Sequence, residues 1–295
     1  MKMNKKVLAL VAAGALVAAL GLFGCGGQQK QEAAESSAPA EATETSAAAA
    51  APEAAETSAP VAASDEIQLI TPGTLTVFTS ADYPPFENLE GDEFVGLDID
   101  LIKAIGEKLG LEVVIENQNF DSIITAVAGG KSCDVGISGF SVDPERAQTI
   151  DFSDPYYTDD QAVAVMQGGA ITADNAAEEL NKEGVRIAVQ SGTTGETYVE
   201  EHFPNAEAVP YTNSTDCFAY MQSGQVDAVC TNLAVVNRMI AGTYSDAEIV
   251  LTEATGEDYA IVIAKTNPAL TAAINGALAE LKADGTLDKL LETWL

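Results

Sequence analysis

Short runs with the composition of β-strands alternate with helical stripes from residue 67 to residue 295, and this alternation restricts the fold more than any other feature. The first cycle is predicted as strand, helix, strand, helix and strand, at residues 75–79, 97–109, 111–115, 120–129 and 133–138. Its first helix carries apolar residues on one face and ends at Gly110. This β-α-β-α-β order predicts a parallel sheet that is covered by helices.

A similar cycle restarts further along the chain. Strands are predicted at residues 185–189, 208–211, 226–230 and 259–264, and helices from residues 191, 213, 233, 269 and 287. Two cycles of similar content predict two α/β lobes. Ligands of such sheets bind beyond the carboxyl ends of the strands, and with two lobes these ends can face one another across a cleft. The candidate ligand loops are therefore those that follow Phe78, Ile137, Val189 and Val229.

Two aromatic residues lie on the loops of the first lobe. Tyr83 belongs to a turn that two prolines make rigid, and Phe120 stands at a strand-to-helix junction. Either ring can present a flat apolar face to a cleft. Either ring can equally be a packed core residue, and the sequence leaves both interpretations open.

Residues 138–146 are the most informative stretch of the chain. Asp143 followed by a proline predicts a helix start, which places Arg146 in the first helical turn, where a cation is unfavourable unless it meets an anion. A guanidinium group can hold a carboxylate with two parallel hydrogen bonds. Ser138, Gly139 and Ser141 offer hydroxyl and backbone partners nearby. The alternative is a surface salt bridge between Arg146 and one of many acidic residues.

The second lobe contributes two further candidate positions. The segment from Gln190 to Thr194 follows a strand and opens a helix, so its backbone N–H groups can bind an anion. The phosphate-binding pattern GxxxxGK[ST] is absent, which argues against nucleotide binding. Asn232 ends a strand and can donate to, or accept from, a ligand in the cleft. Plain helix caps are the alternative at both positions.

Residues 1–66 have the composition of an export signal and a tether. Residues 1–24 join three lysines to an apolar run, which is typical of a signal peptide. The run ends in Leu22-Phe23-Gly24-Cys25, which resembles a lipobox with a bulkier residue than usual at Phe23; an uncleaved membrane helix is the alternative. Residues 25–66 are rich in Ala, Glu, Ser and Pro, which predicts a flexible tether behind a lipidated Cys25.

The composition argues against several kinds of function. The chain carries 14 Lys and Arg against 45 Asp and Glu, and its formal net charge of −31 argues against nucleic-acid binding. With one histidine and four dispersed cysteines, a zinc site is all but excluded, and no cofactor is expected. His202 lacks a paired nucleophile and the GxSxG motif is absent, so no catalytic residue is expected. Cys217 and Cys230 can form a disulfide or remain buried thiols.

Nine short motifs follow one another through the body of the chain: TSADYPPF at 79–86, GLDIDL at 96–101, FD at 120–121, DVGISG at 134–139, PER at 144–146, DFSDPYY at 151–157, VQSGTT at 189–194, GQVDAV at 224–229 and ADGTL at 283–287. In this order and spacing they resemble the bacterial extracellular solute-binding proteins of polar amino acid ABC importers, family 3. The resemblance implies a periplasmic-binding-protein-like fold of type II, in which two crossover strands join two lobes. The lobes would comprise residues 67–160 with 261–295, and residues 161–260.

The resemblance also implies roles for individual residues. Arg146 would hold the α-carboxylate of an amino acid, helped by the backbone amides of Ser141 and Thr194. Tyr83 and Phe120 would sandwich the ligand side chain. The full set of expected ligand-binding residues is Ser80, Tyr83, Phe120, Ser138, Gly139, Ser141, Arg146, Gln190, Thr194 and Asn232.

The chain departs from the family where the α-ammonium group of the ligand would bind. Gly139 would offer its carbonyl, but the family usually has Asp where this chain has Asn232, and an amide keeps an acceptor while losing the charge. Either ammonium recognition is weaker here, or another acid such as Asp82 or Glu257 assists, or the ligand is not an ordinary α-amino acid. Ser80 stands where relatives that prefer basic ligands often carry Asp, which favours a polar or neutral ligand.

These features predict a monomeric, lipid-anchored, extracytoplasmic binding protein that closes on an amino acid and delivers it to an ABC permease and ATPase complex. One alternative is an enzyme similar to cyclohexadienyl dehydratase, which would need an acid–base group in the cleft. The other alternative is a ligand-sensing partner of a receptor.

Overall fold

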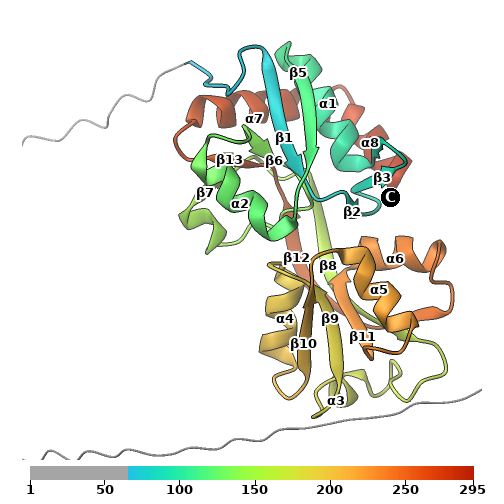
Figure 1. Cartoon of the computed structure of the whole chain (residues 1–295). Coiled ribbons are helices and arrows are strands. Elements are labelled where there is room, and N and C mark those ends of the chain that lie inside the picture. The colour runs from blue at the N-terminus through green and yellow to red at the C-terminus, as the bar shows by residue number, and fades with distance from the viewer. Residues whose placement is uncertain (1–65) are drawn as a thin grey trace, which may run out of the picture. The chain divides into compact units, whose positions relative to one another are not determined.

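The computed structural model describes residues 66–295, so the predicted signal peptide, the lipidation site Cys25 and the tether lie outside the described residues. The described part belongs to one structural unit and contains two five-stranded sheets, one in each of two lobes (Figure 1). None of the helices between residues 66 and 295 combines the length and the apolar character that crossing a membrane requires. The two-lobed α/β architecture predicted from the alternating pattern is confirmed.

The sheet of the first lobe combines parallel and antiparallel strands. Its order is β5 (Glu112–Asn117), β1 (Thr74–Thr79), β6 (Val135–Gly136), β13 (Val262–Ala264) and β7 (Ile150–Phe152). Strand β1 pairs in parallel with β5 and β6, as the β-α-β-α-β order predicts. Strand β13 pairs antiparallel with β6 and β7, so the sheet is mixed and not wholly parallel.

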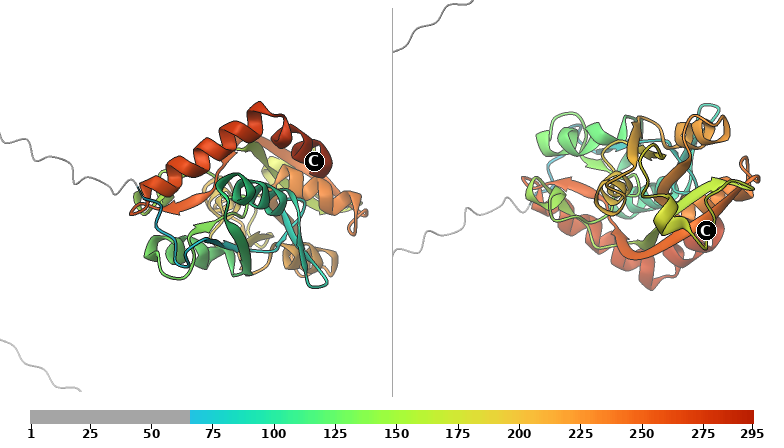
Figure 2. Two further views of the ribbon diagram at one scale, coloured as in Figure 1. Left: turned by 90° about the horizontal axis from the view of Figure 1, so that it is seen from above. Right: turned by 90° about the horizontal axis from the view of Figure 1, so that it is seen from below.

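Alternate residues of β1 point into two different cores, because successive side chains of a strand face opposite sides of its sheet. Leu75 and Val77 pack in the same core as residues of α1 (Leu97–Leu109) and α7 (Pro268–Ala283). Phe78 packs in a second core with residues of α2 (Phe120–Gly129). Helix α8 (Thr286–Trp294) follows α7 and contacts both α1 and α7 near the C-terminus (Figure 2).

A small antiparallel sheet is inserted between β1 and α1. Its strands are β2 (Asp82–Tyr83), β3 (Glu87–Glu90) and β4 (Glu93–Val95). This insertion carries Tyr83 and the buried carboxyl group of Glu87, both of which matter for the cleft described below.

The second lobe repeats the arrangement with its own sheet. The strand order is β10 (Glu207–Tyr211), β9 (Arg186–Gln190), β11 (Ala228–Asn232), β8 (Tyr157–Met166) and β12 (Ala247–Tyr259). Strand β9 pairs in parallel with β10 and β11, whereas β8 pairs antiparallel with β11 and β12. The helices are α3 (Ala176–Glu179), α4 (Thr194–His202), α5 (Ser214–Gln222) and α6 (Leu233–Ala241).

The chain passes between the two sheets twice, from β7 to β8 and from β12 to β13. Strands β8 and β12 are long neighbours, paired from Tyr157 with Tyr259 to Met166 with Ala247. The sequence pattern predicts one strand at residues 259–264, but β12 ends at Tyr259 and β13 begins only at Val262. The pattern missed most of β12 because its second half is polar and its pairing contains two irregularities.

The cysteines of the second lobe are free. Cys217 and Cys230 are both buried thiols, so the disulfide alternative is wrong and the thiol alternative is confirmed. The thiol of Cys217 donates to the carbonyl of Asn213 at 3.7 Å, and that of Cys230 donates to Gln161 Oε1 at 3.8 Å. Each sulfur therefore has its own partner.

A candidate ligand-binding cleft

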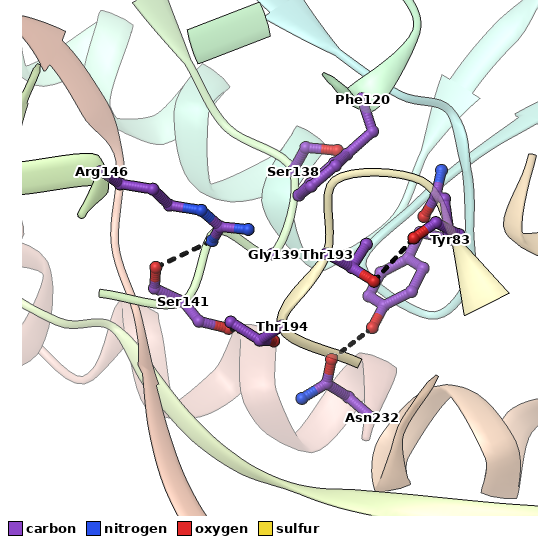
Figure 3. A pocket seen from close by; sticks show the side chains of 10 residues that line it. Tyr83, Phe120, Ser138, Gly139, Ser141, Arg146, Thr193, Thr194 and Asn232 are labelled. Carbon is purple, nitrogen blue, oxygen red and sulfur yellow. Dashed lines mark hydrogen bonds between the residues drawn. The ribbon is translucent and has the colours of Figure 1, made fainter. Parts of the chain in front are cut away.

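A small cavity lies between the two lobes (Figure 3). It is lined by Tyr83, Phe120, Ser138, Gly139, Ser141, Arg146, Gln190, Thr193, Thr194 and Asn232. Most of these residues lie at or just beyond the carboxyl ends of β1, β6, β9 and β11, which is the edge where open α/β sheets bind ligands. Of the ten predicted ligand-binding residues, Ser80 alone does not line the cavity, and Thr193 lines it without having been predicted.

Ser80 supports the lining residues and does not form part of the wall. It is buried, its backbone N–H donates to Ser138 Oγ at 3.1 Å, and its hydroxyl donates to Asp82 Oδ1 at 2.8 Å. Asp82 in turn accepts the backbone N–H of Ser214 at 2.5 Å, at the start of α5 in the other lobe. Burial raises the pKa of Asp82 to about 6, and its hydrogen bonds oppose that shift.

Tyr83 joins the two lobes through its phenol group. The ring is buried beside Phe86, with ring centroids 6.0 Å apart. Its hydroxyl donates to Asn232 Oδ1 at 2.6 Å (Figure 3). The same hydroxyl lies 3.1 Å from Thr231 Oγ1. Desolvation raises the pKa of Tyr83, so the phenol stays a donor at neutral pH. The residue is thus both a packed aromatic and a wall of the cavity.

Phe120 also fits both interpretations that the sequence left open. It is buried at the start of α2, and its ring stacks on Phe140 with centroids 4.7 Å apart. The guanidinium carbon of Arg146 lies 5.6 Å from the Phe120 ring centroid and 5.9 Å from that of Phe140. At these distances the rings attract the cation and restrict its position.

The helix predicted after Asp143 is only one turn long. Asp143 Oδ1 accepts the backbone N–H groups of Glu145 and Arg146 at 2.8 and 2.9 Å, so the predicted capping role is present. A single 3₁₀ turn, Arg146–Gln148, replaces the expected α-helix. The turn stops because β7 begins at Ile150 and takes the backbone into the first sheet.

Arg146 is the one charged residue among those that line the cavity. Its Nη1 donates to the carbonyl of Ser141 and its Nη2 to the carbonyl of Gly192, each at 3.0 Å, so one of its bonds reaches the second lobe. It forms no salt bridge within the described part of the chain, so the surface salt bridge alternative is wrong. Desolvation lowers the pKa of Arg146 from its ordinary value, but an arginine remains protonated at neutral pH.

The second lobe meets the cavity with the first turn of α4. Thr193 caps this helix: its Oγ1 accepts the N–H of Glu196 at 3.2 Å and donates to the carbonyl of Gln190 at 2.8 Å. The helix-cap interpretation therefore applies to Thr193, whereas the Thr194 hydroxyl donates to Glu257 Oε2. Gly192 has a φ of 78°, and a Cβ there would lie 3.2 Å from Cβ of Asp121 in the first lobe. A glycine at this position lets the two lobes approach closely.

Asn232 is buried at the first position before α6, yet its side chain does not cap the helix. Its Oδ1 accepts the Tyr83 hydroxyl, and its Nδ2 lies 3.5 Å from Glu257 Oε2. The helix-cap alternative for this side chain is wrong, and the amide faces the cleft as the sequence predicts.

Two buried carboxyl groups hold the loop of Ser138 and Gly139. Glu87 Oε1 accepts the Ser138 hydroxyl at 2.7 Å, and Asp98 Oδ2 accepts the Gly139 N–H and the Tyr156 hydroxyl, both at 2.8 Å. Burial and the charge of Asp98 raise the pKa of Glu87 well above its usual range, and burial raises the pKa of Asp98 to about 6. The sequence signalled neither partner, because each lies at least 41 residues from the group it holds.

Glu257 and Gln161 complete the polar contacts around the cavity. Glu257 Oε2 accepts the hydroxyls of Ser141 at 2.5 Å and Thr194 at 2.6 Å. Its Oε1 accepts Gln161 Nε2 at 2.7 Å and the Thr255 hydroxyl at 3.1 Å. Sequence reasoning considered Glu257 as an assisting acid and missed Gln161, which no motif marks.

Known proteins share both the sequence pattern and the fold. Residues 75–295 match the family model described as bacterial extracellular solute-binding proteins, family 3. The chain is 33% identical over 221 residues to ABC transporter arginine-binding protein 1 of Escherichia coli strain K12, covering 73% of this chain and 88% of that protein. The solved structure of an ancestral arginine-binding protein bound to arginine matches with a TM-score of 0.71 and 38% identity, over 76% of this chain and 98% of that one.

A second solved structure bears on the enzymatic alternative. It is an ancestral amino acid-binding protein described as a precursor of cyclohexadienyl dehydratase. It matches with a TM-score of 0.69 and 37% identity, over 75% of this chain and 95% of that one.

Proposed function

The chain belongs to the bacterial extracellular solute-binding proteins of family 3, and from this premise we propose that it binds an amino acid between its lobes and delivers it to an ABC importer. The relatives reported above are binding proteins, and the one related to cyclohexadienyl dehydratase is itself described as amino acid-binding. These names support a binding protein over an enzyme. Closure would couple to binding because Arg146 and Tyr83 already contact the opposite lobe.

One observation supports this function best: a guanidinium group that lines the cavity without a carboxylate partner among residues 66–295. Two donors of Arg146 hold the carbonyls of Ser141 and Gly192, and the guanidinium has five N–H donors in total. The remaining donors can hold the α-carboxylate of a ligand in a bidentate pair. The hydroxyls of Ser141 and Thr194 lie beside the same cavity.

We propose testing a wider range of ligand side chains than the polar or neutral ones that the sequence favours. The inclination toward a polar or neutral amino acid rested partly on Ser80, which does not line the cavity. The arginine-binding relatives support a test that includes basic ligands. Arginine, lysine, histidine, glutamine and cystine form a suitable panel.

The test is calorimetric titration of this panel into the wild type and the Arg146→Ala variant. Loss of the carboxylate partner should weaken binding at least about 100-fold, since a buried charge pair with one partner removed costs several kcal/mol. Arg238→Ala is a matched control, because Arg238 is exposed on α6 and does not line the cavity. Unchanged affinity in Arg146→Ala, with a native circular dichroism spectrum, would contradict the assignment.

We further propose that residues 1–24 are a signal peptide, that Cys25 carries the lipid and that residues 25–66 tether the lobes outside the cell membrane. The lobes would be residues 67–160 with 261–295, and residues 161–260. The lipobox-like run before Cys25 supports the anchor. Incorporation of labelled palmitate into the wild type but not into Cys25→Ser would support it, and equal labelling would contradict it.

A further inference from the structure

An amino acid is a zwitterion, so a cleft that holds its carboxylate at Arg146 also needs an anionic partner for its ammonium group. Among residues 66–295, five carboxyl groups contact residues that line the cavity: Asp82, Glu87, Asp98, Asp143 and Glu257. Asp143 is engaged by the backbone N–H groups of Glu145 and Arg146. Glu87 and Asp98 are wholly excluded from solvent, where each acts on the pKa of the other. Asp82 is engaged by the Ser80 hydroxyl and by a backbone N–H of α5.

Glu257 differs from the other four because it accepts the hydroxyl groups of two lining residues, one from each lobe. It lies near the end of β12, and after this strand the chain crosses to β13 in the sheet of the first lobe. Its Oε2 accepts Ser141 from the first lobe and Thr194 from the second, at 2.5 and 2.6 Å. It also borders, together with Arg146, a larger groove beside the cavity. The carboxylate of Glu257 therefore lies where the cavity meets this larger groove.

The direction of these hydrogen bonds decides what the cleft can recognise. A serine or threonine hydroxyl has one hydrogen to donate and two lone pairs that accept. Because Ser141 and Thr194 donate their hydrogens to Glu257, each hydroxyl can accept from a ligand, although Thr194 Oγ1 already accepts one hydrogen bond from Gln161 Nε2 at 3.2 Å. This arrangement suits a donor such as an ammonium group and disfavours a second carboxylate at the same place.

Asn232 does not fill the same role. Its carbonyl oxygen is already engaged by the Tyr83 hydroxyl at 2.6 Å, while its amide nitrogen is directed toward Glu257 at 3.5 Å. An amide nitrogen is a donor and cannot accept a hydrogen bond from an ammonium group. The carboxylate that this amide nitrogen reaches is that of Glu257.

We propose that Glu257 is the anionic partner of the ligand's α-ammonium group, acting through its charge and by directing the hydroxyls of Ser141 and Thr194 to accept. This assignment rests on the proposed amino acid-binding function and identifies a specificity-determining residue within that site. It implies that the cleft distinguishes an α-amino acid from the same carboxylic acid without the amino group.

The experiment compares ligand pairs that differ only in the α-ammonium group. L-arginine is paired with 5-guanidinopentanoate, and L-glutamine with 5-amino-5-oxopentanoate, each titrated calorimetrically into the full protein. The wild type should prefer the amino acid of at least one pair by about 10- to 100-fold, the range expected for a hydrogen bond to a charged group. Glu257→Gln keeps the shape but removes the charge and adds donors, so this preference should fall below about 3-fold.

Two further variants make the result specific. Glu253→Gln removes an exposed acid from the same strand and should keep the wild-type preference. Adding Asn232→Asp to Glu257→Gln restores a carboxylate among the residues that line the cavity, and should recover part of the preference. Glu257→Ala serves as a second removal of the charge if Glu257→Gln unfolds in thermal melts.

The outcomes separate this inference from the function on which it rests. A wild-type preference that persists in Glu257→Gln or Glu257→Ala overturns the assignment of Glu257 while leaving amino acid binding intact. Tighter binding of the amino acid in these variants also overturns it, since Glu257 would then only occupy the ligand's place. A wild type that binds none of the amino acids refutes the proposed function itself.

Discussion

Replacing Glu87 by Gln should leave the protein stable at pH 7, whereas removing its neighbour Asp98 should not. Both carboxyl groups are wholly buried and act on one another, and no donor elsewhere among residues 66–295 reaches Glu87 Oε2 or Asp98 Oδ1. Burial and the charge of Asp98 raise the pKa of Glu87 well above its usual range, which favours its protonated form, and Asp98, with a pKa of about 6, is ionised at pH 7. The proton of Glu87 therefore joins the pair.

The magnitudes follow from the partners of each group. The amide that Glu87→Gln introduces would donate to Asp98 and accept from Ser138 as a protonated Glu87 does, so this substitution should not lower the free energy of unfolding at pH 7 by more than about 1 kcal/mol. Asp98→Ala leaves two buried donors, the Gly139 N–H and the Tyr156 hydroxyl, without an acceptor. At about 1–3 kcal/mol for each, the loss should total about 2–6 kcal/mol.

The pH dependence has a definite sign. The folded-state pKa of Asp98 rises from 3.8 to about 6, and that of Glu87 rises well above 4.5, so the folded protein binds more protons than the unfolded chain. Stability is therefore greatest below these ordinary values and is lost as pH rises through the folded-state values. Because Gln does not titrate, the free energy of unfolding of Glu87→Gln should rise relative to that of the wild type between pH 5 and pH 9.

Urea unfolding at pH 5, 7 and 9, followed by circular dichroism, measures these differences. Glu93→Gln is the control for removing one negative charge, because Glu93 is exposed on β4 near the same helix. The reasoning is refuted if Glu87→Gln is as unstable as Asp98→Ala at pH 7. It is also refuted if the wild type becomes more stable relative to Glu87→Gln as pH rises.

Two further predictions concern the cleft and the thiols. Tyr83→Phe keeps the packed ring but removes the hydroxyl that contacts Asn232 and Thr231, so calorimetry should show ligand affinity about 5- to 10-fold lower; equal affinity would mean that this contact does not stabilise closure. Cys133, Cys217 and Cys230 are buried, and burial raises the pKa of Cys133 to about 12, so peptide mass mapping should find them alkylated only after unfolding. Alkylation of the native protein, or a peptide linking Cys217 to Cys230, would contradict the structure.

Much of the architecture could be predicted because its signals are local. The apolar stripe of residues 97–109 and the glycine after it match helix α1, and the strand at residues 75–79 matches β1. Loops after parallel strands were the expected ligand loops, and they supply most of the lining of the cavity. The capping role of Asp143 was also visible, since it depends on neighbours two and three residues away.

The remaining features depend on groups that meet only in the folded chain. Nothing near Asp143 in the sequence shows that β7 will end the helix after one turn, and nothing near Ser80 shows that it will lie behind the cavity. Polar residues 252–258 lack the alternation of a strand, yet pairing with β8 orders them.

The two-lobed α/β architecture could be predicted from the chain alone, because the spacing of apolar residues and turn signals acts over a few residues. The place of Arg146 at the cleft was implied by the resemblance of its motif, and the groups that hold the cleft together meet only in the folded protein. Glu257 meets Ser141 across 116 residues, and Tyr83 meets Asn232 across 149. Hydrogen bonds select partners by distance and direction in space, and the sequence interval between two residues carries no information about either.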